Sequence, residues 1–258
     1  MTAPAAWDGP RTAIVTGAGF GMGISIAHRL AAEGASVAVW DVNVEGANAT
    51  VKSIEAAGGR AIAQEVDISS RARVEAAAAE VVETLGAPTI LVNNAGISPF
   101  DKFLEIDDAS LDRVIDVNLK GTFYCCQTIV PHMVATGWGR IVNITSSSAQ
   151  TGSEMQTHYS ASKGAIVALT RSLAAALGRK GITVNAVPPS VIDTPGLRSA
   201  EAAGMVGDEK ALARIVPMRR LGTGEDIAGA VAYFCRDDAG FVTGQVLGVN
   251  GGRVMASG

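Results

Sequence analysis

Short apolar runs, rich in β-branched residues, alternate along the chain with longer Ala-rich segments in which apolar residues recur at helical spacing. Strands that are apolar on both faces are typical of a parallel sheet covered by helices on both sides. The runs predict strands over Thr12–Thr16, Ser36–Asp41, Ala61–Val66, Ile90–Val92, Arg140–Thr145, Thr183–Val187 and Val246–Val249. The segments between them predict helices over Gly21–Glu33, Val44–Ala57, 70–85, 110–134, 157–179 and 224–235.

This alternation predicts the α/β fold class, as a single doubly wound Rossmann-type domain with a mostly parallel seven-stranded sheet flanked by helices. We expect residues 1–10 to form an N-terminal tail and residues 11–258 to form one dinucleotide-binding and catalytic domain. The stretch Pro188–Leu221 lacks strong periodicity. Long loops of this kind are commonly lids or binding loops, so we expect a substrate lid over about 188–221.

Composition and charge exclude several classes of function. The 258 residues are 48% hydrophobic, enough for one domain with a large core, and the formal net charge of −4 contains no long run of one sign. That balance argues against nucleic acid or an anionic membrane surface as the main partner. No apolar run reaches about 18 residues, the approximate length of a membrane span, and the first residues do not resemble a secretory signal. We therefore expect a cytoplasmic protein.

The cysteines and histidines do not indicate a metal site. Cys125, Cys126 and Cys235 have neither CxxC nor Cys/His spacing, and the three histidines are scattered along the chain. The odd number of cysteines and their apolar surroundings indicate reduced, buried thiols. We expect no bound metal.

A glycine-rich turn over Gly17–Gly23 joins the first predicted strand to the first helix. Glycines let backbone N–H groups approach a pyrophosphate, and the helix N-terminus attracts the anion. Asp41 closes the second strand, 20 residues after Gly21, where a carboxylate accepts hydrogen bonds from the adenosine ribose. A carboxylate there repels a 2′-phosphate, so the pattern favours NAD(H) over NADP(H). The alternative is that Asp41 only caps the following helix.

A second constellation predicts acid/base chemistry. Tyr159 and Lys163 lie one turn apart on one face of a predicted helix. A phenol has an ordinary pKa of about 10, which a nearby ammonium and an oxidised nicotinamide lower. Ser146 lies 13 residues before Tyr159, at the end of a predicted strand, where side chains face the ligand crevice. Asn118 is a polar residue inside a helix that should be largely buried, and such a residue indicates a specific role.

These motifs resemble those of the classical short-chain dehydrogenase/reductase family. The TGxxxGxG pattern at Thr16–Gly23, Asp67, the NNAG sequence at 93–96, Asn118, Ser146 and the Tyr159/Lys163 pair stand in the family's order and approximate spacing. The resemblance extends from about residue 10 to Gly252. It departs from the family at Pro188-Pro189, where Pro-Gly is common, and we expect a stiffer start to the lid there.

The resemblance implies a role for each residue at these positions. Tyr159 exchanges the proton on the substrate oxygen, and Ser146 hydrogen-bonds that oxygen. Lys163 binds the nicotinamide ribose and lowers the pKa of Tyr159, while Asn118 holds a water that links Lys163 to solvent. Asp67 lies beside the adenine, and Thr194 lies near the nicotinamide carboxamide. The expected cofactor-binding residues are Gly17, Gly19, Phe20, Gly21, Met22, Gly23, Asp41, Val42, Asp67, Ile68, Asn94, Ala95, Gly96, Tyr159, Lys163, Pro189, Val191 and Thr194.

Ser146, Ser147 and Ser148 form a run, so the catalytic serine has to be chosen among them. The offset of 13 residues to Tyr159 favours Ser146, and Ser148 is a candidate for a second polar group toward the substrate. The predicted helices over 110–134 and 157–179 are apolar on more than one face, which is typical of an interface. The resemblance implies a homotetramer built in part from these two helices.

Together these features predict an NAD(H)-dependent oxidoreductase that moves hydride between nicotinamide and a small-molecule secondary alcohol or ketone. One alternative is a 3-oxoacyl-thioester (acyl carrier protein) reductase, although Asp41 disfavours the NADPH that such enzymes usually take. An alternative of another class is a non-catalytic dinucleotide-sensing protein. Such proteins usually lose the tyrosine or the lysine, and this chain has both.

Overall fold

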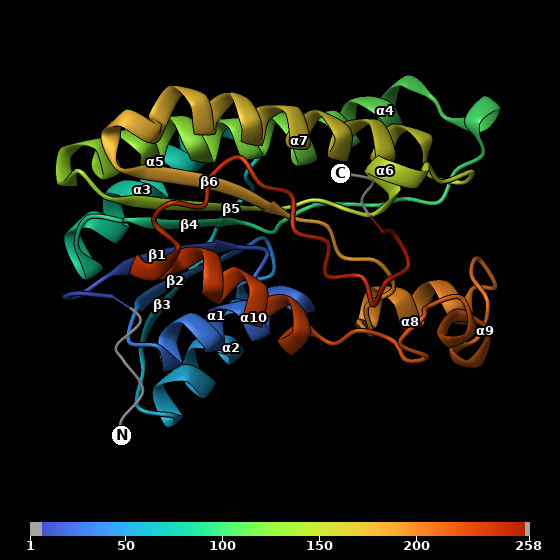
Figure 1. Cartoon of the computed structure of the whole chain (residues 1–258), viewed down its shortest axis with the longest axis horizontal. Helices are drawn as coiled ribbons and strands as arrows, with labels where there is room; N and C mark the ends of the chain where they lie inside the picture. Colours follow the sequence, from blue (N-terminus) through green and yellow to red (C-terminus); the bar gives the residue numbers. More distant parts are fainter. Residues whose placement is uncertain (1–6, 256–258) are drawn as a thin grey trace.

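The computed structural model describes residues 7–255 and contains a parallel six-stranded sheet in the order β3-β2-β1-β4-β5-β6 (Figure 1). The order reverses between β1 and β4, and ligands of doubly wound sheets bind at such a switch point. The strands are β1 (Thr12–Thr16), β2 (Ser36–Asp41), β3 (Arg60–Glu65), β4 (Ile90–Asn93), β5 (Gly139–Ile144) and β6 (Ile182–Val187).

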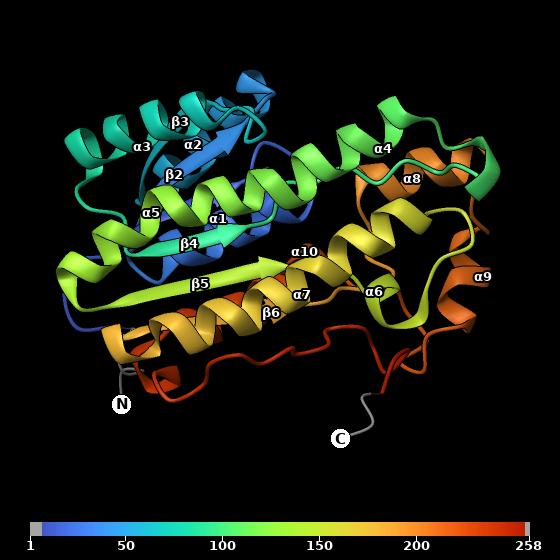
Figure 2. The ribbon, with the colours of Figure 1, turned by 90° about the horizontal axis from the view of Figure 1, so that it is seen from above.

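Helices cover both faces of the sheet. Helices α1, α2 and α10 lie on one side, and α3, α5 and α7 lie on the other (Figures 1 and 2). The helices are α1 (Met22–Ala32), α2 (Val44–Ala56), α3 (Arg71–Leu85), α4 (Asp108–Ile115), α5 (Thr122–Thr136), α6 (Ser148–Thr151), α7 (Thr157–Leu177), α8 (Pro195–Ala202), α9 (Glu209–Arg214) and α10 (Gly224–Cys235). Single 3₁₀ turns lie at Phe103–Glu105, Gly178–Lys180 and Asp237–Ala239. A π-helical turn, η2 (Asp116–Gly121), joins α4 to α5.

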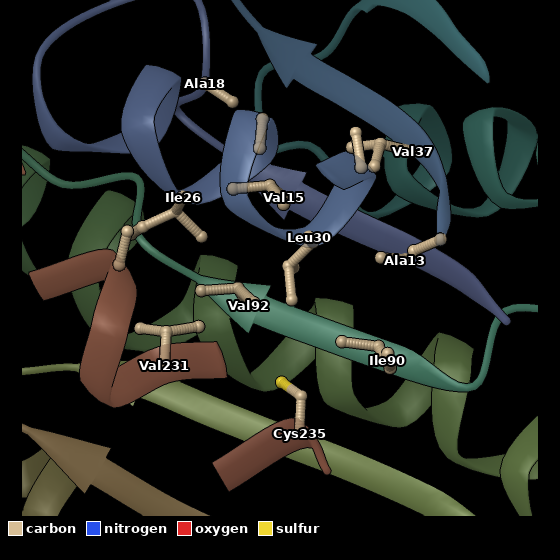
Figure 3. Close-up of a cluster of buried hydrophobic side chains, with 14 of the residues drawn as sticks. Ala13, Val15, Ala18, Ile26, Leu30, Val37, Ile90, Val92, Val231 and Cys235 are labelled. Carbon is tan, nitrogen blue, oxygen red and sulfur yellow. The ribbon is translucent and has the colours of Figure 1, made fainter. Parts of the chain in front are cut away.

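The two helical layers enclose two apolar clusters, because successive side chains of each strand point to opposite faces. Ala13 and Val15 of β1 pack with Leu30 of α1 and Val231 of α10 in the first cluster (Figure 3). Ile14, between them in the sequence, belongs to the second cluster on the other face. Every residue of β1 is buried, as expected for the centre of a doubly wound sheet.

The prediction of a seventh strand over Val246–Val249 was wrong. This segment runs parallel to the end of β6, but only isolated bridges pair its first residue with Ala186 and its last residue with Pro189. Pro188 and Pro189 have no N–H group to donate, so a regular ladder cannot continue past β6. The segment lies beside the sheet without forming a strand.

The predicted lid, 188–221, contains two short helices that its weak periodicity did not indicate. Thr194 caps α8 by accepting a hydrogen bond from Leu197 N at 3.2 Å, and Asp208 caps α9 by accepting one from Ala211 N at 2.7 Å. Both caps are of the residue types that begin helices. The helices themselves are too short for an apolar period to be recognised. They lie beyond the carboxyl end of the sheet (Figure 1).

The predicted N-terminal tail lies partly outside the described residues. Its described part packs against the domain: Trp7 is buried in the first cluster, and Asp8 N donates to Asp237 Oδ2 at 2.6 Å. The last predicted domain residues, 256–258, also lie outside the described part.

The three cysteines are free and buried. Burial raises the pKa of Cys126 and of Cys235 to about 12, so both thiols stay protonated at neutral pH. Among residues 7–255, no three His, Cys, Asp or Glu side chains are grouped so that they could hold a metal ion. Within the same residues, none of the helices has the length and apolar character that crossing a membrane requires.

Candidate active site

A cavity of about 390 Å³ lies at the carboxyl end of the sheet, beside the switch point between β1 and β4. Most of the residues predicted to bind the cofactor line it, although they come from segments far apart in the sequence. They are Gly17, Phe20, Gly21, Met22, Asp41, Val42, Asp67, Ile68, Asn94, Ala95, Gly96, Tyr159, Lys163 and Thr194.

The glycine-rich loop has the backbone shape that close approach to a phosphate requires. Gly17 and Gly21 have φ values of 64° and 57°, in the left-handed region that favours glycine. Gly23 does not line the cavity but supports the loop from behind: a side-chain carbon there would overlap Gly17 O and approach Asn94 Nδ2 to 2.7 Å. The loop leads into the N-terminus of α1, whose unpaired N–H groups attract an anion. These residues therefore fit the pyrophosphate of a dinucleotide.

Asp41 is buried at the end of β2 and fixes the glycine-rich loop. Its Oδ2 accepts a hydrogen bond from Gly19 N at 2.8 Å, and its Oδ1 accepts one from Asn43 N at 2.8 Å. Gly19 thus contributes through this hydrogen bond and not as part of the cavity wall. The N-cap of α2 is Asn43, whose side chain accepts a hydrogen bond from Gly46 N. The alternative that Asp41 is the cap is therefore wrong.

Pro189 and Val191 also lie away from the cavity wall. The Pro189 carbonyl accepts a hydrogen bond from Ser147 N at 2.8 Å, which ties the start of the lid to the serine run after β5. Val191 packs against Val216 and Leu221 within the lid. Both residues therefore position the lid in this structure.

Eight further residues complete the cavity wall. Some are direct neighbours of predicted residues, and sequence position was the signal that could have identified them. Arg113, in contrast, comes from α4, which no motif marked. The eight are Val66, Ile97, Ser98, Arg113, Val117, Ile144, Thr145 and Gly196.

Lys163 is buried in α7, and its ammonium is held at the end of β5. Its Nζ donates to Ile144 O at 2.9 Å and lies 5.8 Å from the centre of the Tyr159 ring. Burial lowers the pKa of Lys163 to about 8. The lysine therefore remains mostly charged at neutral pH but is close to the range in which it can release a proton.

Tyr159 lies one helical turn before Lys163 and is partly buried. Burial raises the pKa of Tyr159, and a hydrogen bond with Ser146 acts in the opposite direction. Burial alone therefore leaves less of the phenolate form that can accept a proton, and a nearby positive charge is needed to stabilise the phenolate. The structure places the Lys163 ammonium beside it. Ser146 is not part of the cavity wall, although Thr145, the residue before it, is.

Asn118 lies in the π-helical turn η2 and is fully buried. Its side chain pairs with the backbone of Ile97 on both sides, accepting from Ile97 N and donating to Ile97 O, each at 2.9 Å. It also donates to Ser162 Oγ at 3.1 Å. The amide is therefore engaged in holding the segment after β4 beside α7.

Lys163 gives a testable prediction about stability. The unfolded lysine has a pKa near 10.5 and the folded one a pKa of about 8, so between these values the unfolded chain binds more protons. The free energy of unfolding then rises with pH across this window. Relative to wild type, Lys163→Met should be more stable at pH 7 by up to about 3 kcal/mol, and this advantage should disappear toward pH 10.5. Urea unfolding of the cofactor-free protein at several pH values measures the difference.

The loss of the hydrogen bond to Ile144 O lowers the stability of Lys163→Met equally at every pH, so the change with pH carries the test. The exposed Lys52 in α2 provides the control, because Lys52→Met should show no such pH dependence. A difference between wild type and Lys163→Met that stays constant from pH 7 to 10.5 would show that the buried ammonium carries no such cost.

Comparison with known proteins places the chain in a family. Residues 17–253 match the family model described as enoyl-(acyl carrier protein) reductase. The chain is 42% identical to a (2S)-[(R)-hydroxy(phenyl)methyl]succinyl-CoA dehydrogenase subunit of Thauera aromatica, over 96% of this chain and 98% of the relative. It is 38% identical to a 3-oxoacyl-[acyl-carrier-protein] reductase of Staphylococcus aureus, over 95% and 98% of the two chains.

A solved structure agrees with these relatives. It is a short-chain dehydrogenase/reductase of Brucella melitensis, titled glucose/ribitol dehydrogenase, with a TM-score of 0.88 and 35% identity. The match covers 95% of this chain and 97% of that one. The protein described here therefore belongs to the short-chain dehydrogenase/reductase family, whose members are oxidoreductases that bind a nicotinamide cofactor.

Proposed function

We propose that the protein is an NAD(H)-dependent dehydrogenase/reductase that acts on a secondary alcohol or ketone. The observation that carries this proposal is the convergence of Tyr159 and Lys163 on one cavity, whose wall also includes Asp41, the glycine-rich loop and Thr145, the residue before Ser146. An acid/base group and a dinucleotide cradle are thus combined in one crevice.

The residues that would hold the cofactor follow from the cavity wall. The glycine-rich loop and the N-terminus of α1 would bind the pyrophosphate, and Asp41 would accept hydrogen bonds from the adenosine ribose. Lys163 would bind the nicotinamide ribose, and Thr194 would lie near the carboxamide. Bound there, the nicotinamide supplies the hydride acceptor for oxidation and the hydride donor for reduction.

In the oxidation direction, Tyr159 acts as the base that takes the proton from the substrate hydroxyl. The Lys163 ammonium stabilises the phenolate, and Ser146 hydrogen-bonds and orients the substrate oxygen. In the reduction direction, Tyr159 returns the proton to the carbonyl oxygen. The lowered pKa of Lys163 suits the exchange of a proton with solvent after each turnover.

We further propose that Asn118 supports this proton exchange. Its side chain is engaged with Ile97, so its contribution is to hold the turn that borders Lys163. Gly96 is part of the same arrangement, because a side-chain carbon there would lie 3.1 Å from Asn118 Oδ1 and 3.3 Å from Lys163 Nζ. A water held in this turn would link the lysine to solvent.

The thioester reductase is a second candidate, because two relatives are named for thioesters: a hydroxyl-bearing CoA ester in one case and a 3-oxoacyl carrier protein in the other. Both names describe chemistry at a carbon that bears oxygen, and Tyr159 could exchange a proton with that oxygen in either substrate. The absorbance of NADH and NADPH, followed with simple secondary alcohols and with 3-hydroxyacyl-CoA esters, distinguishes the two. A dinucleotide sensor would show cofactor binding and no turnover with either set.

Replacing the proposed acid/base tests the mechanism. Tyr159→Phe should lower kcat by about 10²–10⁴-fold, since general acid/base catalysis contributes this much. The affinity for NADH, measured by fluorescence titration, should change little. Tyr124→Phe in α5, away from the cavity, is the matched control and should keep wild-type turnover. Near-full turnover in Tyr159→Phe would exclude this tyrosine as the acid/base.

The cofactor preference depends on the charge of Asp41. Wild type should have a higher kcat/KM with NAD than with NADP. In Asp41→Asn the ratio of these two kcat/KM values should fall by about tenfold or more, because one charge that repels the 2′-phosphate of NADP is removed. Glu45→Gln removes an exposed charge from the first turn of the adjacent α2 and should leave the ratio unchanged. A wild-type preference for NADP would contradict the proposal.

We propose that the protein is a homotetramer with two kinds of interface. Exposed apolar side chains lie on two separate faces. Phe123 of α5 borders a groove of about 230 Å³ between α5 and α7, while Tyr233 and Phe241 are exposed near the end of α10. Burial of both faces would stabilise an assembly by the hydrophobic effect.

Light scattering should therefore give a mass of about four times 26.3 kDa. Phe123→Glu should reduce the mass by disrupting one of the two interfaces. The exposed Phe103, which lies in the β4–α4 connection and outside both faces, is the control, and Phe103→Glu should keep the wild-type mass. A monomeric wild type would refute this assembly.

We also propose that the protein works in the cytoplasm. Its three cysteines are buried and free, as is typical of proteins in a reducing compartment.

A further inference from the structure

The three serines that follow β5 use their hydrogen-bonding groups in different ways. Ser146 Oγ lies 3.1 Å from Ser148 N and 2.9 Å from Ser148 Oγ, and both contacts are hydrogen bonds. Ser147 takes part through its backbone, since its N–H donates to Pro189 O and its carbonyl accepts from Thr151 N. Ser148 therefore contacts the side chain of Ser146 directly, whereas Ser147 makes these contacts through its backbone alone.

The number of hydrogen bonds that a hydroxyl group can donate and accept limits the further partners of Ser146. A serine hydroxyl has one proton to donate and two lone pairs to accept with. The backbone N–H of Ser148 can only donate, so it occupies one lone pair of Ser146 Oγ. When the Ser148 hydroxyl also donates, the second lone pair is occupied. The proton of Ser146 then remains for a partner other than Ser148.

We propose that Ser148 is a positioning residue that fills the acceptor sites of Ser146 and so directs the one proton of Ser146 toward the oxygen on which Tyr159 acts. The inference rests on the proposed function, because it concerns the same site. Negative charge grows on the substrate oxygen as the alcohol loses its proton or as the ketone accepts hydride. A hydroxyl that receives a hydrogen bond is a stronger donor, so the chain Ser148 to Ser146 to substrate oxygen stabilises that charge.

The opposite arrangement makes the opposite prediction. If Ser146 donated its proton to Ser148, Ser148 would compete with the substrate oxygen for that proton. Removal of the Ser148 hydroxyl would then leave the rate unchanged or raise it. The sign of the effect therefore distinguishes the two arrangements.

The backbone around Ser148 is held independently of its side chain, which makes a substitution there interpretable. Ser146 O accepts from Ala149 N at 3.1 Å, and Ser148 O accepts from Gly152 N at 2.9 Å. The hydrogen bond of Ser147 N to Pro189 O fixes the turn from the lid side. An alanine at position 148 keeps all of these bonds and also the N–H that Ser146 accepts from.

The experiment compares Ser148→Ala with Ser147→Ala, which removes the neighbouring hydroxyl, and with Ser148→Thr, which restores one. Ser148→Ala should lower kcat about fivefold, the effect of losing one hydrogen bond, and the affinity for NADH should stay within about twofold of wild type on the same basis. Ser147→Ala and Ser148→Thr should turn over like wild type. Ser148→Cys keeps the size of the side chain with a weak donor and should behave like Ser148→Ala.

The pH profile provides a readout that a structural role would not change. The hydrogen bond from Ser146 lowers the pKa of Tyr159. In the oxidation direction, kcat/KM should rise with pH as Tyr159 ionises, and the midpoint of this rise should move to higher pH in Ser148→Ala. Ser147→Ala should leave the midpoint in place.

A double-mutant cycle tests whether Ser148 acts through Ser146. In the Ser146→Ala background, the further change Ser148→Ala should have no effect on kcat. An unchanged or increased kcat in Ser148→Ala, or an equal loss in the presence and absence of the Ser146 hydroxyl, would overturn the inference. Turnover that does not depend on Tyr159 would instead overturn the proposed function, so the two failures are distinguishable.

Discussion

Two side chains join the ends of β1 and β4, and the geometry of the site depends on this junction. Thr16 Oγ1 accepts hydrogen bonds from Asn94 N and Ala95 N, and Asn94 Nδ2 donates to the carbonyls of Thr16 and Gly17, all at 3.0 Å. Buried backbone groups of loops need partners that a sheet ladder cannot provide. Because the strand order reverses between these two strands, the same bonds fix both the glycine-rich turn and the NNAG segment across the crevice.

The position of Lys163 lowers the stability of the folded chain, because its ammonium is buried. Its ammonium is buried to lie beside Tyr159, and the pKa lowered to about 8 shows that its charged form has lost hydration. The space it occupies depends on the lack of a side chain at Gly96, and the segment around Gly96 is held by Asn118. Gly96, Asn118 and Lys163 therefore pack against one another, although they belong to motifs that lie far apart in the sequence. A strongly perturbed lysine in a crevice is typical of a functional site.

Much of the fold could be predicted because long apolar periods and strand ends are local properties. The residues at strand ends converge as soon as the sheet is parallel, so most of the cavity wall followed from the order of the elements. The features that the sequence did not predict depend on contacts between distant residues or on single hydrogen bonds. The range 110–134, predicted as one helix, contains the π-helical turn η2, which no apolar period indicates. Arg113 reaches the cavity from α4, and the contact of Ser148 with Ser146 is visible only in three dimensions.

The lid differs in what holds it from the edge of the cavity formed by Tyr159 and Lys163. Arg198 of α8 pairs with Asp193 and with Glu209 of α9, but the three side chains are between 41% and 60% exposed, and surface pairs of this kind contribute only about 0–1 kcal/mol each. The lid has a small apolar cluster of its own, Val191, Val216 and Leu221, and Ile192 joins it to the first cluster of the core. Tyr159 and Lys163, in contrast, are fixed by a long helix packed on the sheet. Substitutions among the exposed residues of the lid should therefore leave the positions of Tyr159 and Lys163 unchanged.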